Sequence, residues 1–496
     1  MILHSSFPLS PYTVIIGLEV HVQLATESKL FCGCSTEFGA APNTQICPVC
    51  LGMPGALPVM NRKAFELSLR TAAAINCQLA RFTKWDRKQY YYPDLPKGYQ
   101  ISQFDLPFSH DGWLEISDPK GKFEPKRVGI IRAHLEEDAG KSMHDERAGV
   151  ADSQIDLNRT GTPLLEIVSQ PDMRSPAEAK AFLSELKLLL TYLGVSDCNM
   201  QEGSLRVDGN INLHIDTPDG KVATPIVEIK NMNSFRAVER ALAYEAERLY
   251  EVWQETGQKL GDVPKQTRGW DDAANVTRGQ RHKEESSDYR YFPDPDLAPV
   301  TVTDAQVEQV LASLGELPAT LRTRLETEFG LSPYDSDVLV NQGRALVDYF
   351  LHVASATGDG KLASNWLQQD VLRMLNERNW DIAAFPVTAP ALVVLLKKVQ
   401  AGELITSRAR EVLQAMIDTG RSADEVMREK GIEQVDESEL VALCQELVAA
   451  NPKVAEDFKA GKMQAIGSLV GQAKKKNPNV NPGRVRELLI EALGKL

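Results

Sequence analysis

Four cysteines in two close pairs constrain this chain most strongly. Cys32-Gly-Cys34 is followed after twelve residues by Cys47-Pro-Val-Cys50. Four thiolates in two pairs match a closed tetrahedral zinc site, because each pair brings two sulfurs to one ion across a tight turn. Ordinary buried thiols or a pair of disulfides are the alternatives. A closed site leaves no open coordination position, so we predict a structural Zn²⁺ that holds a loop in place and performs no chemistry.

The rest of the chain carries no signal for export or for membrane insertion. Residues 1–8 have no basic region leading into an apolar core, and no apolar run reaches the roughly eighteen residues of a membrane span. We therefore expect a cytoplasmic protein, in which thiols stay reduced, and this favours zinc over disulfides. At 496 residues the chain is too long for one core, so about two to four domains are expected.

Several segments before residue 297 read as strands with one polar face. In 13–24, Glu19, His21 and Gln23 share one side and apolar residues share the other, because successive strand side chains point to opposite faces. The same alternation recurs in 132–138, 206–215 and 227–230. A solvated antiparallel sheet is the plain alternative. Carboxylates and imidazoles suit a plain strand surface less well than threonine and aromatics do, so we predict a functional polar cradle.

The residue types on this polar face suit Mg²⁺, which usually takes one or two carboxylates together with the phosphates of a substrate. The catalytic and magnesium candidates are Glu19, His21, Glu136, Glu166 and Glu228. Arg206 and Lys230 are the candidates for contacts to phosphate oxygens. The segment 135–142 ends like a Walker A loop, but Leu135 replaces the first glycine and carboxylates fill the loop. We therefore expect ATP to bind by another geometry.

The organisation changes at 291–299, where three prolines among aspartates end the strand-rich region. Apolar residues then recur at helical spacing in 338–357, 364–376 and 390–400, and a further helical unit begins near Gly402. The sequence predicts an α+β protein with three domains. These are an antiparallel-sheet cradle with a zinc loop over 1–297, a helical domain over 298–402 and a small helical tail over 403–496.

The tail differs in charge from the rest of this acidic chain. The net charge is −13, yet 451–496 holds nine Lys or Arg against four Asp or Glu. A charge run is usually a solvated face, and nucleic-acid contact is the alternative. The tRNA-binding candidates are Lys474, Lys475, Lys476, Arg484 and Arg486. In the same tail, the spacing of Gly467 and Gly471 permits a close helix contact. A tight crossing of helices within the core is the purely structural alternative.

These residues make the chain resemble the GatB/GatE family, the B subunits of aspartyl/glutamyl-tRNA amidotransferases. The resemblance covers essentially the whole chain. It rests on the segments 17–23 (GLEVHVQ), 47–55 (CPVCLGMPG), 92–103 (YPDLPKGYQISQ), 134–142 (HLEEDAGKS), 158–169 (NRTGTPLLEIVS), 227–236 (VEIKNMNSFR), 288–297 (DYRYFPDPDL) and 467–472 (GSLVGQ).

The resemblance implies an enzyme that uses ATP and Mg²⁺ to phosphorylate the side-chain carboxylate of Glu-tRNA(Gln) or Asp-tRNA(Asn). Ammonia from glutamine hydrolysed in the partner subunit GatA then displaces the phosphate, and GatC is the third subunit. By this resemblance His21, Glu136 and Glu166 match magnesium-binding positions, with Glu19 and Glu228 close by. The implied tail is a YqeY-like module that contacts tRNA. The four cysteines, which some members lack, are all present, so the resemblance also implies zinc.

Two other classes of function compete with this one. A non-catalytic tRNA-binding scaffold would use the zinc loop and the basic tail while the carboxylates merely face water. A metal-dependent hydrolase would use the carboxylate cluster to activate water. The sequence contains no Gly-x-Ser-x-Gly motif and no glycine- and serine-rich amidase stretch, so the ammonia source is expected on another chain.

Overall fold

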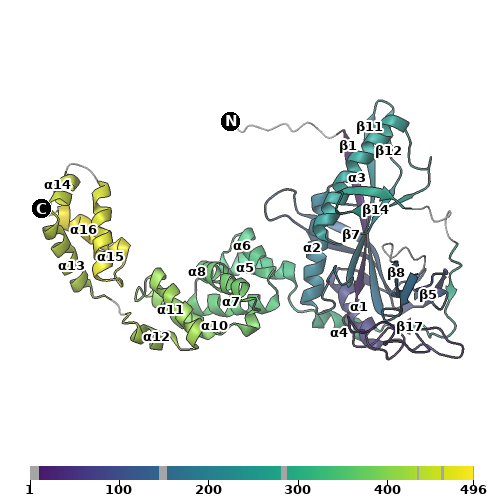
Figure 1. Ribbon diagram of the computed structural model, residues 1–496, viewed down its shortest axis with the longest axis horizontal. Helices are drawn as coiled ribbons and strands as arrows, with labels where there is room; N and C mark the ends of the chain where they lie inside the picture. The colour runs from purple at the N-terminus through teal and green to yellow at the C-terminus, as the bar shows by residue number, and fades with distance from the viewer. Residues whose placement is uncertain (1–10, 145–152, 281–287, 433–434, 460–462, 495–496) are drawn as a thin grey trace. The chain divides into compact units, whose positions relative to one another are not determined.

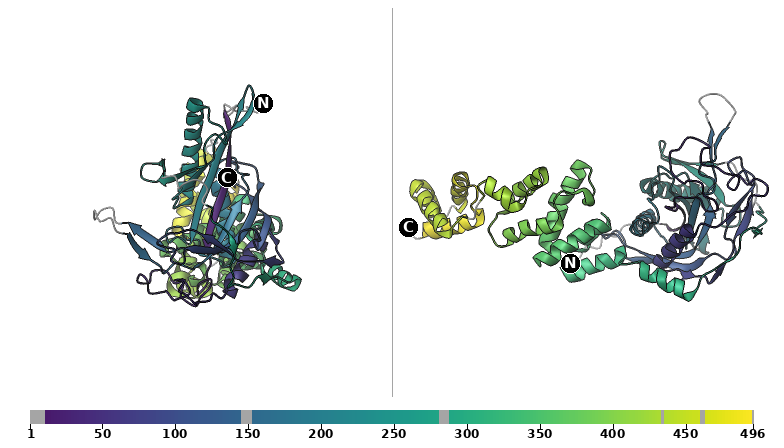
Figure 2. Two further views of the ribbon diagram at one scale, coloured as in Figure 1. Left: turned by 90° about the vertical axis from the view of Figure 1, so that its right-hand side faces the viewer. Right: turned by 90° about the horizontal axis from the view of Figure 1, so that it is seen from below.

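The computed structural model describes residues 11–144, 153–280, 288–432, 435–459 and 463–494. The chain divides into two compact units, residues 1–320 and residues 321–496. The first holds the sheets and the second holds only helices among its described residues (Figure 2). The boundary predicted at 297 lies inside the first unit, and the one predicted at 402 lies inside the second. In the described part of the chain, no helix is long and apolar enough to cross a membrane.

A ten-stranded sheet forms the centre of the first unit, in the order β15-β14-β13-β11-β1-β10-β7-β6-β2, with β12 paired to β11. Its strands are β1 (Tyr12–Gln23), β2 (Gln78–Leu79), β6 (Ser109–Ile116), β7 (Lys126–Glu137), β10 (Pro163–Ser169), β11 (Leu205–Thr217), β12 (Gly220–Ala223), β13 (Val227–Lys230), β14 (Gln266–Asp271) and β15 (Val276–Gly279). Every neighbouring pair is antiparallel except β13 with β14. The antiparallel-sheet prediction therefore holds with one parallel pair as the exception.

The apolar face of this sheet is covered by helices, which leaves the other face for polar side chains. The helices are α1 (Arg62–Ala74), α2 (Pro176–Tyr192) and α3 (Phe235–Thr256), and Figure 1 shows α2 and α3 alongside the sheet. Leu18 and Val20 of β1 are buried in the same core as these helices. Gly209 of β11 lies against α3, since a Cβ added there would be in ordinary contact with Leu242 Cδ2 at 3.4 Å. The alternation predicted for β1 is thus confirmed.

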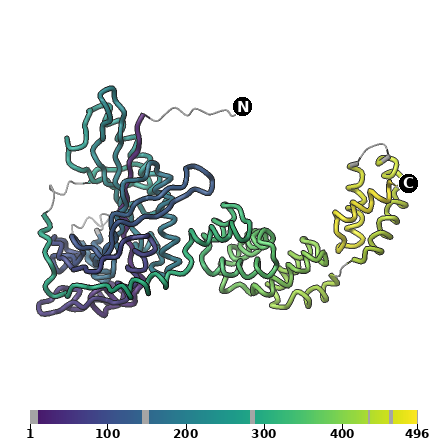
Figure 3. The backbone as a smooth tube through the Cα atoms, turned by 180° about the vertical axis from the view of Figure 1, so that it is seen from behind, coloured from purple at the N-terminus to yellow at the C-terminus, as the bar shows by residue number. Residues whose placement is uncertain are grey.

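Three small sheets complete the first unit, and two of them attach the proline-rich exit. They are β16-β4-β5, β17-β3 and β8-β9, formed by β3 (Phe82–Thr83), β4 (Asp86–Gln89), β5 (Tyr99–Ser102), β8 (Lys141–His144), β9 (Ser153–Asp156), β16 (Phe292–Pro293) and β17 (Val300–Thr301). Figure 3 follows the exit segment back along the amino-terminal part of the unit before α4 (Asp304–Ser313). The segment 135–142 runs from β7 into β8, so the expectation that it is no Walker A loop is confirmed.

The second unit follows the predicted helical spacing with two corrections. Its elements are α5 (Pro318–Phe329), α6 (Pro333–Val340), α7 (Arg344–Thr357), α8 (Gly360–Trp366), η1 (Leu367–Val371), α9 (Leu372–Arg378), η2 (Ile382–Ala384), α10 (Ala389–Gln400), α11 (Thr406–Thr419), α12 (Ala423–Glu429), α13 (Glu437–Ala450), α14 (Pro452–Lys459), η3 (Met463–Ala465), α15 (Ile466–Lys476) and α16 (Pro482–Gly494). The predicted segment 338–357 is two helices, because Gly343 breaks it with a φ of +98°. Gly467 and Gly471 do not mark a close helix contact among the described residues, since no atom of another element described there lies within 4 Å of an added Cβ at either position.

Candidate active site and metal centres

Strand register assembles the polar face of the sheet into rows. Glu166 of β10 pairs with His21 of β1 on one side and with His134 of β7 on the other. His21 also pairs with Arg206 of β11. Side chains directly opposite each other on neighbouring strands point to the same face of a sheet. Four residues that are far apart in sequence therefore stand in one row across four strands.

The first candidate metal centre joins two residues of this row, His21 and Glu166, to Glu136, which lies two residues beyond His134 on β7. His21 Nε2 is 3.6 Å from Glu166 Oε2 and 3.8 Å from Glu136 Oε1. The ligand atoms of these three residues all lie within 4.8 Å of one another. One imidazole and two carboxylates that converge on one point form a set able to hold a divalent cation. The structure therefore brings together the three residues that the sequence singled out for magnesium.

His134 supports this centre and was not among the predicted site residues. Its Nε2 lies 3.3 Å from Glu166 Oε2 and 3.9 Å from Glu136 Oε2, and its side chain is only 4% exposed. The signal for it was present, because His134 shares the alternating polar face with Glu136. A buried imidazole beside two carboxylates holds those carboxylates in place and offsets part of their charge.

The surroundings of the two carboxylates in the first centre shift their pKa values in opposite directions. Burial and the nearby charge of Glu166 raise the pKa of Glu136 above its usual value. Burial acts to raise the pKa of Glu166, but the charges and close contacts of His134 and His21 lower it overall. Burial acts to lower the pKa of His21, but its close contact with Glu166 and the charges of both carboxylates raise it overall. Protons and a cation thus compete for the same site.

A second acidic group lies on the same face of the sheet. The ligand atoms of Glu19, Asp208 and Glu228 lie within 4.8 Å of one another, and Glu19 pairs directly with Asp208 across β1 and β11. Lys230 Nζ lies 2.5 Å from Asp208 and 3.5 Å from Glu228. Asn210 donates a hydrogen bond to Glu19. Asp208 was not among the predicted site residues, although it alternates with them along β11.

The two phosphate candidates are already engaged by carboxylates. Arg206 lies 2.7 Å from Asp138, and Lys230 is held by the second acidic group. Asp138 is buried and also accepts a hydrogen bond from Gln23. Burial raises its pKa, but the charges of Arg206 and Arg159 lower the pKa overall. Each ion pair uses only part of the donor set of its cation, and Arg206 Nε has no hydrogen-bond partner among the described residues.

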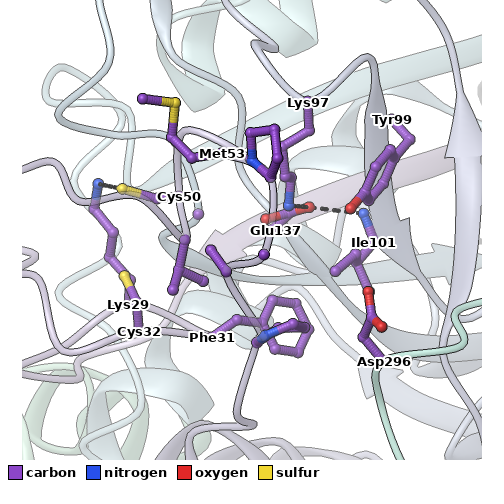
Figure 4. A pocket seen from close by; sticks show the side chains of 17 residues that line it. Lys29, Phe31, Cys32, Cys50, Met53, Lys97, Tyr99, Ile101, Glu137 and Asp296 are labelled. Carbon is purple, nitrogen blue, oxygen red and sulfur yellow. Dashed lines mark hydrogen bonds and ion pairs between the residues drawn. The ribbon is translucent and has the colours of Figure 1, made fainter.

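The four cysteines converge in a loop between β1 and α1. Their sulfurs lie within 4.8 Å of one another, and all four are free thiols. Cys47 Sγ and Cys50 Sγ are 3.9 Å apart. In a tetrahedron with Zn–S distances of about 2.3 Å, two sulfurs lie about 3.8 Å apart. The side chains therefore fit a zinc ion, and Cys32 and Cys50 line a neighbouring cavity of about 200 Å³ (Figure 4).

The basic residues of the tail divide into paired and unpaired groups. Lys476 lies 2.6 Å from Glu446, and Arg484 forms ion pairs with Glu437 and Glu487. Of the five tRNA-binding candidates, three are exposed and have no acidic partner among the described residues: Lys474, Lys475 and Arg486. The lysines lie in the last turn of α15, where the helix dipole favours positive charge.

Comparisons with known proteins agree with this architecture. Residues 14–308 match the model of the GatB/GatE catalytic domain, and residues 348–493 match the GatB domain model. The chain is similar to the GatB subunit of the aspartyl/glutamyl-tRNA(Asn/Gln) amidotransferase of Rhodopirellula baltica, with 61% identity over 98% of both chains. It is similar to the same subunit of Moorella thermoacetica, with 47% identity over 97% of this chain and 100% of the relative. As its motifs predicted, the chain therefore belongs to the GatB/GatE family of tRNA amidotransferase subunits.

Proposed function

We propose that the chain phosphorylates the side-chain carboxylate of Glu-tRNA(Gln) or Asp-tRNA(Asn) with ATP and converts the product to the amide. The convergence of His21, Glu136 and Glu166 on one point of the polar sheet face carries this proposal. The names of the relatives support a tRNA(Asn/Gln) substrate. Ammonia does not displace the oxygen of a carboxylate, so the carboxylate needs a leaving group first. Transfer of the γ-phosphoryl group of ATP supplies it and releases ADP.

The chain's own residues position this chemistry. Phosphoryl transfer depends mainly on alignment of the reactants and on neutralisation of phosphate charge. Magnesium held by His21, Glu136 and Glu166 would neutralise the charge on the phosphates. Arg206 and Lys230 supply further positive charge through the N–H donors that their carboxylate partners do not use. Ammonia then attacks the acyl phosphate, phosphate leaves, and the amide forms.

Glu19 and Glu228 act close to this centre in the proposed mechanism. Together with Asp208 they form the second acidic group, which gives the polar face more negative charge than one cation neutralises. Asp208→Asn is expected to lower the rate of ATP-dependent amidation about tenfold or more, because it removes one of three carboxylates that would hold a further cation beside the phosphates and the ion-pair partner that positions Lys230. Initial rates at saturating tRNA measure the effect. An unchanged rate would show that this group is only a solvated surface.

Ammonia is proposed to come from a glutaminase partner, GatA, in a heterotrimer that also contains GatC. Two observations support this assembly. The relatives are named as one subunit of a larger enzyme, and the chain carries no amidase motif of its own. In the proposed function a single structural zinc, held by Cys32, Cys34, Cys47 and Cys50, fixes the loop that leads into α1.

The purified heterotrimer provides the direct test of the function. We expect amide formation on mischarged tRNA only when ATP, magnesium and either glutamine or ammonia are present. ADP should form in proportion to amide. A scaffold would show no ATP turnover in any combination. A metal-dependent hydrolase would release a hydrolysed product without glutamine, and either outcome would overturn the proposal.

The basic tail is proposed to contact tRNA phosphates without reading bases. Among the five candidates, Lys474, Lys475 and Arg486 have no acidic partner in the described part of the chain, so they neutralise tRNA phosphates, and displace the counterions of those phosphates, more readily than Lys476 and Arg484 do. We expect Lys474→Gln with Lys475→Gln to flatten the salt dependence of tRNA binding by about one unit of log–log slope for each phosphate interaction removed.

The paired cations supply the matched control for this prediction. Lys476→Gln with Arg484→Gln also removes two positive charges from the same helical tail, but those charges are already offset by Glu446 and Glu437. In this control variant the log–log slope of the salt dependence of tRNA binding should change less than in the Lys474→Gln, Lys475→Gln variant. Equal slopes in both variants and in the wild type would show that the tail binds no phosphate.

A further inference from the structure

Lys29 is a lysine with no access to solvent. Its exposed fraction is 0%, which places it among the largest fully buried side chains of the protein. Its Nζ donates to the Gln45 carbonyl oxygen at 2.7 Å and lies 3.7 Å from Cys50 Sγ. Figure 4 shows the side chain pointing at that sulfur. These are its two polar partners in the described part of the chain.

A buried ammonium group requires a nearby negative charge. Removal of a charge from water is strongly unfavourable unless the charge is paired. The Gln45 carbonyl provides a hydrogen bond but no charge. The two carboxylates that line the same cavity are taken by other cations, because Glu137 pairs with Lys97 and Asp296 pairs with Arg87. Among the described residues, the source of negative charge that lies beside Lys29 is the cysteine cluster, with Cys50 Sγ 3.7 Å from Nζ.

We propose that Lys29 is the counter-charge of the four-cysteine zinc site and that it retains the metal by neutralising part of the thiolate charge. This inference rests on the zinc site proposed above. Four thiolates around one Zn²⁺ leave two excess negative charges, and a cation next to the sulfurs stabilises that arrangement. Lys29 therefore acts as a positioning residue that touches a ligand rather than the metal.

The backbone around Lys29 joins both halves of the cysteine loop. Its own N–H donates to the Cys34 carbonyl at 3.0 Å, while its side chain reaches Cys50. The next residue, Leu30, donates to the Gly161 carbonyl at 2.8 Å, which attaches this backbone to the neighbouring part of the first unit. Both cysteine pairs are thus tied to one residue that carries a buried cation.

Replacement of Lys29 by methionine separates a charge effect from a packing effect. We expect Lys29→Met to release zinc to a colorimetric chelator about 10 to 100 times faster than the wild type, the range typical of removing a partner of a metal ligand. The melting temperature of the zinc-loaded heterotrimer should fall. The melting temperature of the zinc-free protein should stay the same or rise, because the variant no longer buries an uncompensated cation. A purely structural role would lower both melting temperatures alike.

Lys97→Met is the matched control in the same cavity. Lys97 is also buried, but it pairs with Glu137 and not with a sulfur. This variant should destabilise the zinc-loaded and zinc-free proteins equally and leave the zinc release rate unchanged. Zinc content of the wild type is measured first. A wild type without zinc overturns the zinc site itself, whereas a zinc-containing wild type with an unchanged release rate in Lys29→Met overturns only the role of Lys29.

Discussion

Replacement of Glu136 or of Glu166 by alanine is expected to lower the rate of ATP-dependent amidation at least about a hundredfold, since metal-mediated charge stabilisation contributes several kcal/mol to phosphoryl transfer. Each carboxylate lies within 3.8 Å of His21, so either substitution opens the first metal centre. Glutamine hydrolysis by the proposed glutaminase partner should persist, because the proposal assigns these residues no part in it. Single-turnover amidation and glutaminase assays on the same heterotrimer measure the two effects.

Glu115→Ala is the control for this prediction. Glu115 belongs to the same sheet, in β6, but its side chain is 55% exposed and far less constrained than Glu136. Its substitution should leave the amidation rate within about twofold of the wild type, because exposed ion pairs contribute little. Thermal melting of all three variants checks that each is folded. A near-wild-type amidation rate in both Glu136→Ala and Glu166→Ala would refute the assignment of the metal centre.

The polar cradle was predictable because strand side chains alternate. Once 13–24 and 132–138 are recognised as strands, Glu19, His21 and Glu136 must lie on the face opposite the apolar residues. The helical part of the chain was predictable from spacing and from caps. Ser422 and Glu425, spaced as Ser-x-x-Glu in the sequence, form a capping box, and Pro452 is the first residue of a helix.

Strand register was not predictable from alternation. The pairing of Glu19 with Asp208, and of Glu166 with His134, depends on how strands distant in sequence slide past each other. A shift by two residues would keep every side chain on its face but bring different partners together. For this reason the sequence placed Asp208 and His134 on the polar face without assigning either to a site. The engagement of Arg206 by Asp138 depends on the same register.

The glycine pair in the tail was compatible with a close helix contact and with a tight crossing in the core, and residue spacing alone does not distinguish these two arrangements. Gly467 and Gly471 lie on one side of α15, and such a pair permits a second helix to approach closely only when one is placed there. No atom occupies that space at either residue. Similarly, the count of basic residues in the tail gave no indication that Lys476 and Arg484 are neutralised by acids from α13.

Loss of the cysteine site is expected to affect stability before it affects chemistry. We expect one zinc per chain, bound by four sulfurs at about 2.3 Å. Cys32→Ser should abolish stoichiometric zinc binding and lower the free energy of unfolding of the first unit by at least about 4 kcal/mol, the contribution of a ligand present at a thousand times its Kd. We expect this loss of stability because the closely spaced sulfurs, bound to one ion, would join two turns that are twelve residues apart in the sequence.

Elemental analysis of protein purified without chelator and denaturant unfolding measure these two effects. Cys77→Ser is the matched control, because Cys77 is a free thiol of the first unit outside the cluster and its substitution should leave the zinc content unchanged. At temperatures where Cys32→Ser remains folded, its amidation rate should fall much less than that of Glu136→Ala, because a closed four-sulfur site offers no position to a substrate. Zinc-free wild-type protein of undiminished stability, or disulfides among these four cysteines, would show that the loop is held in another way.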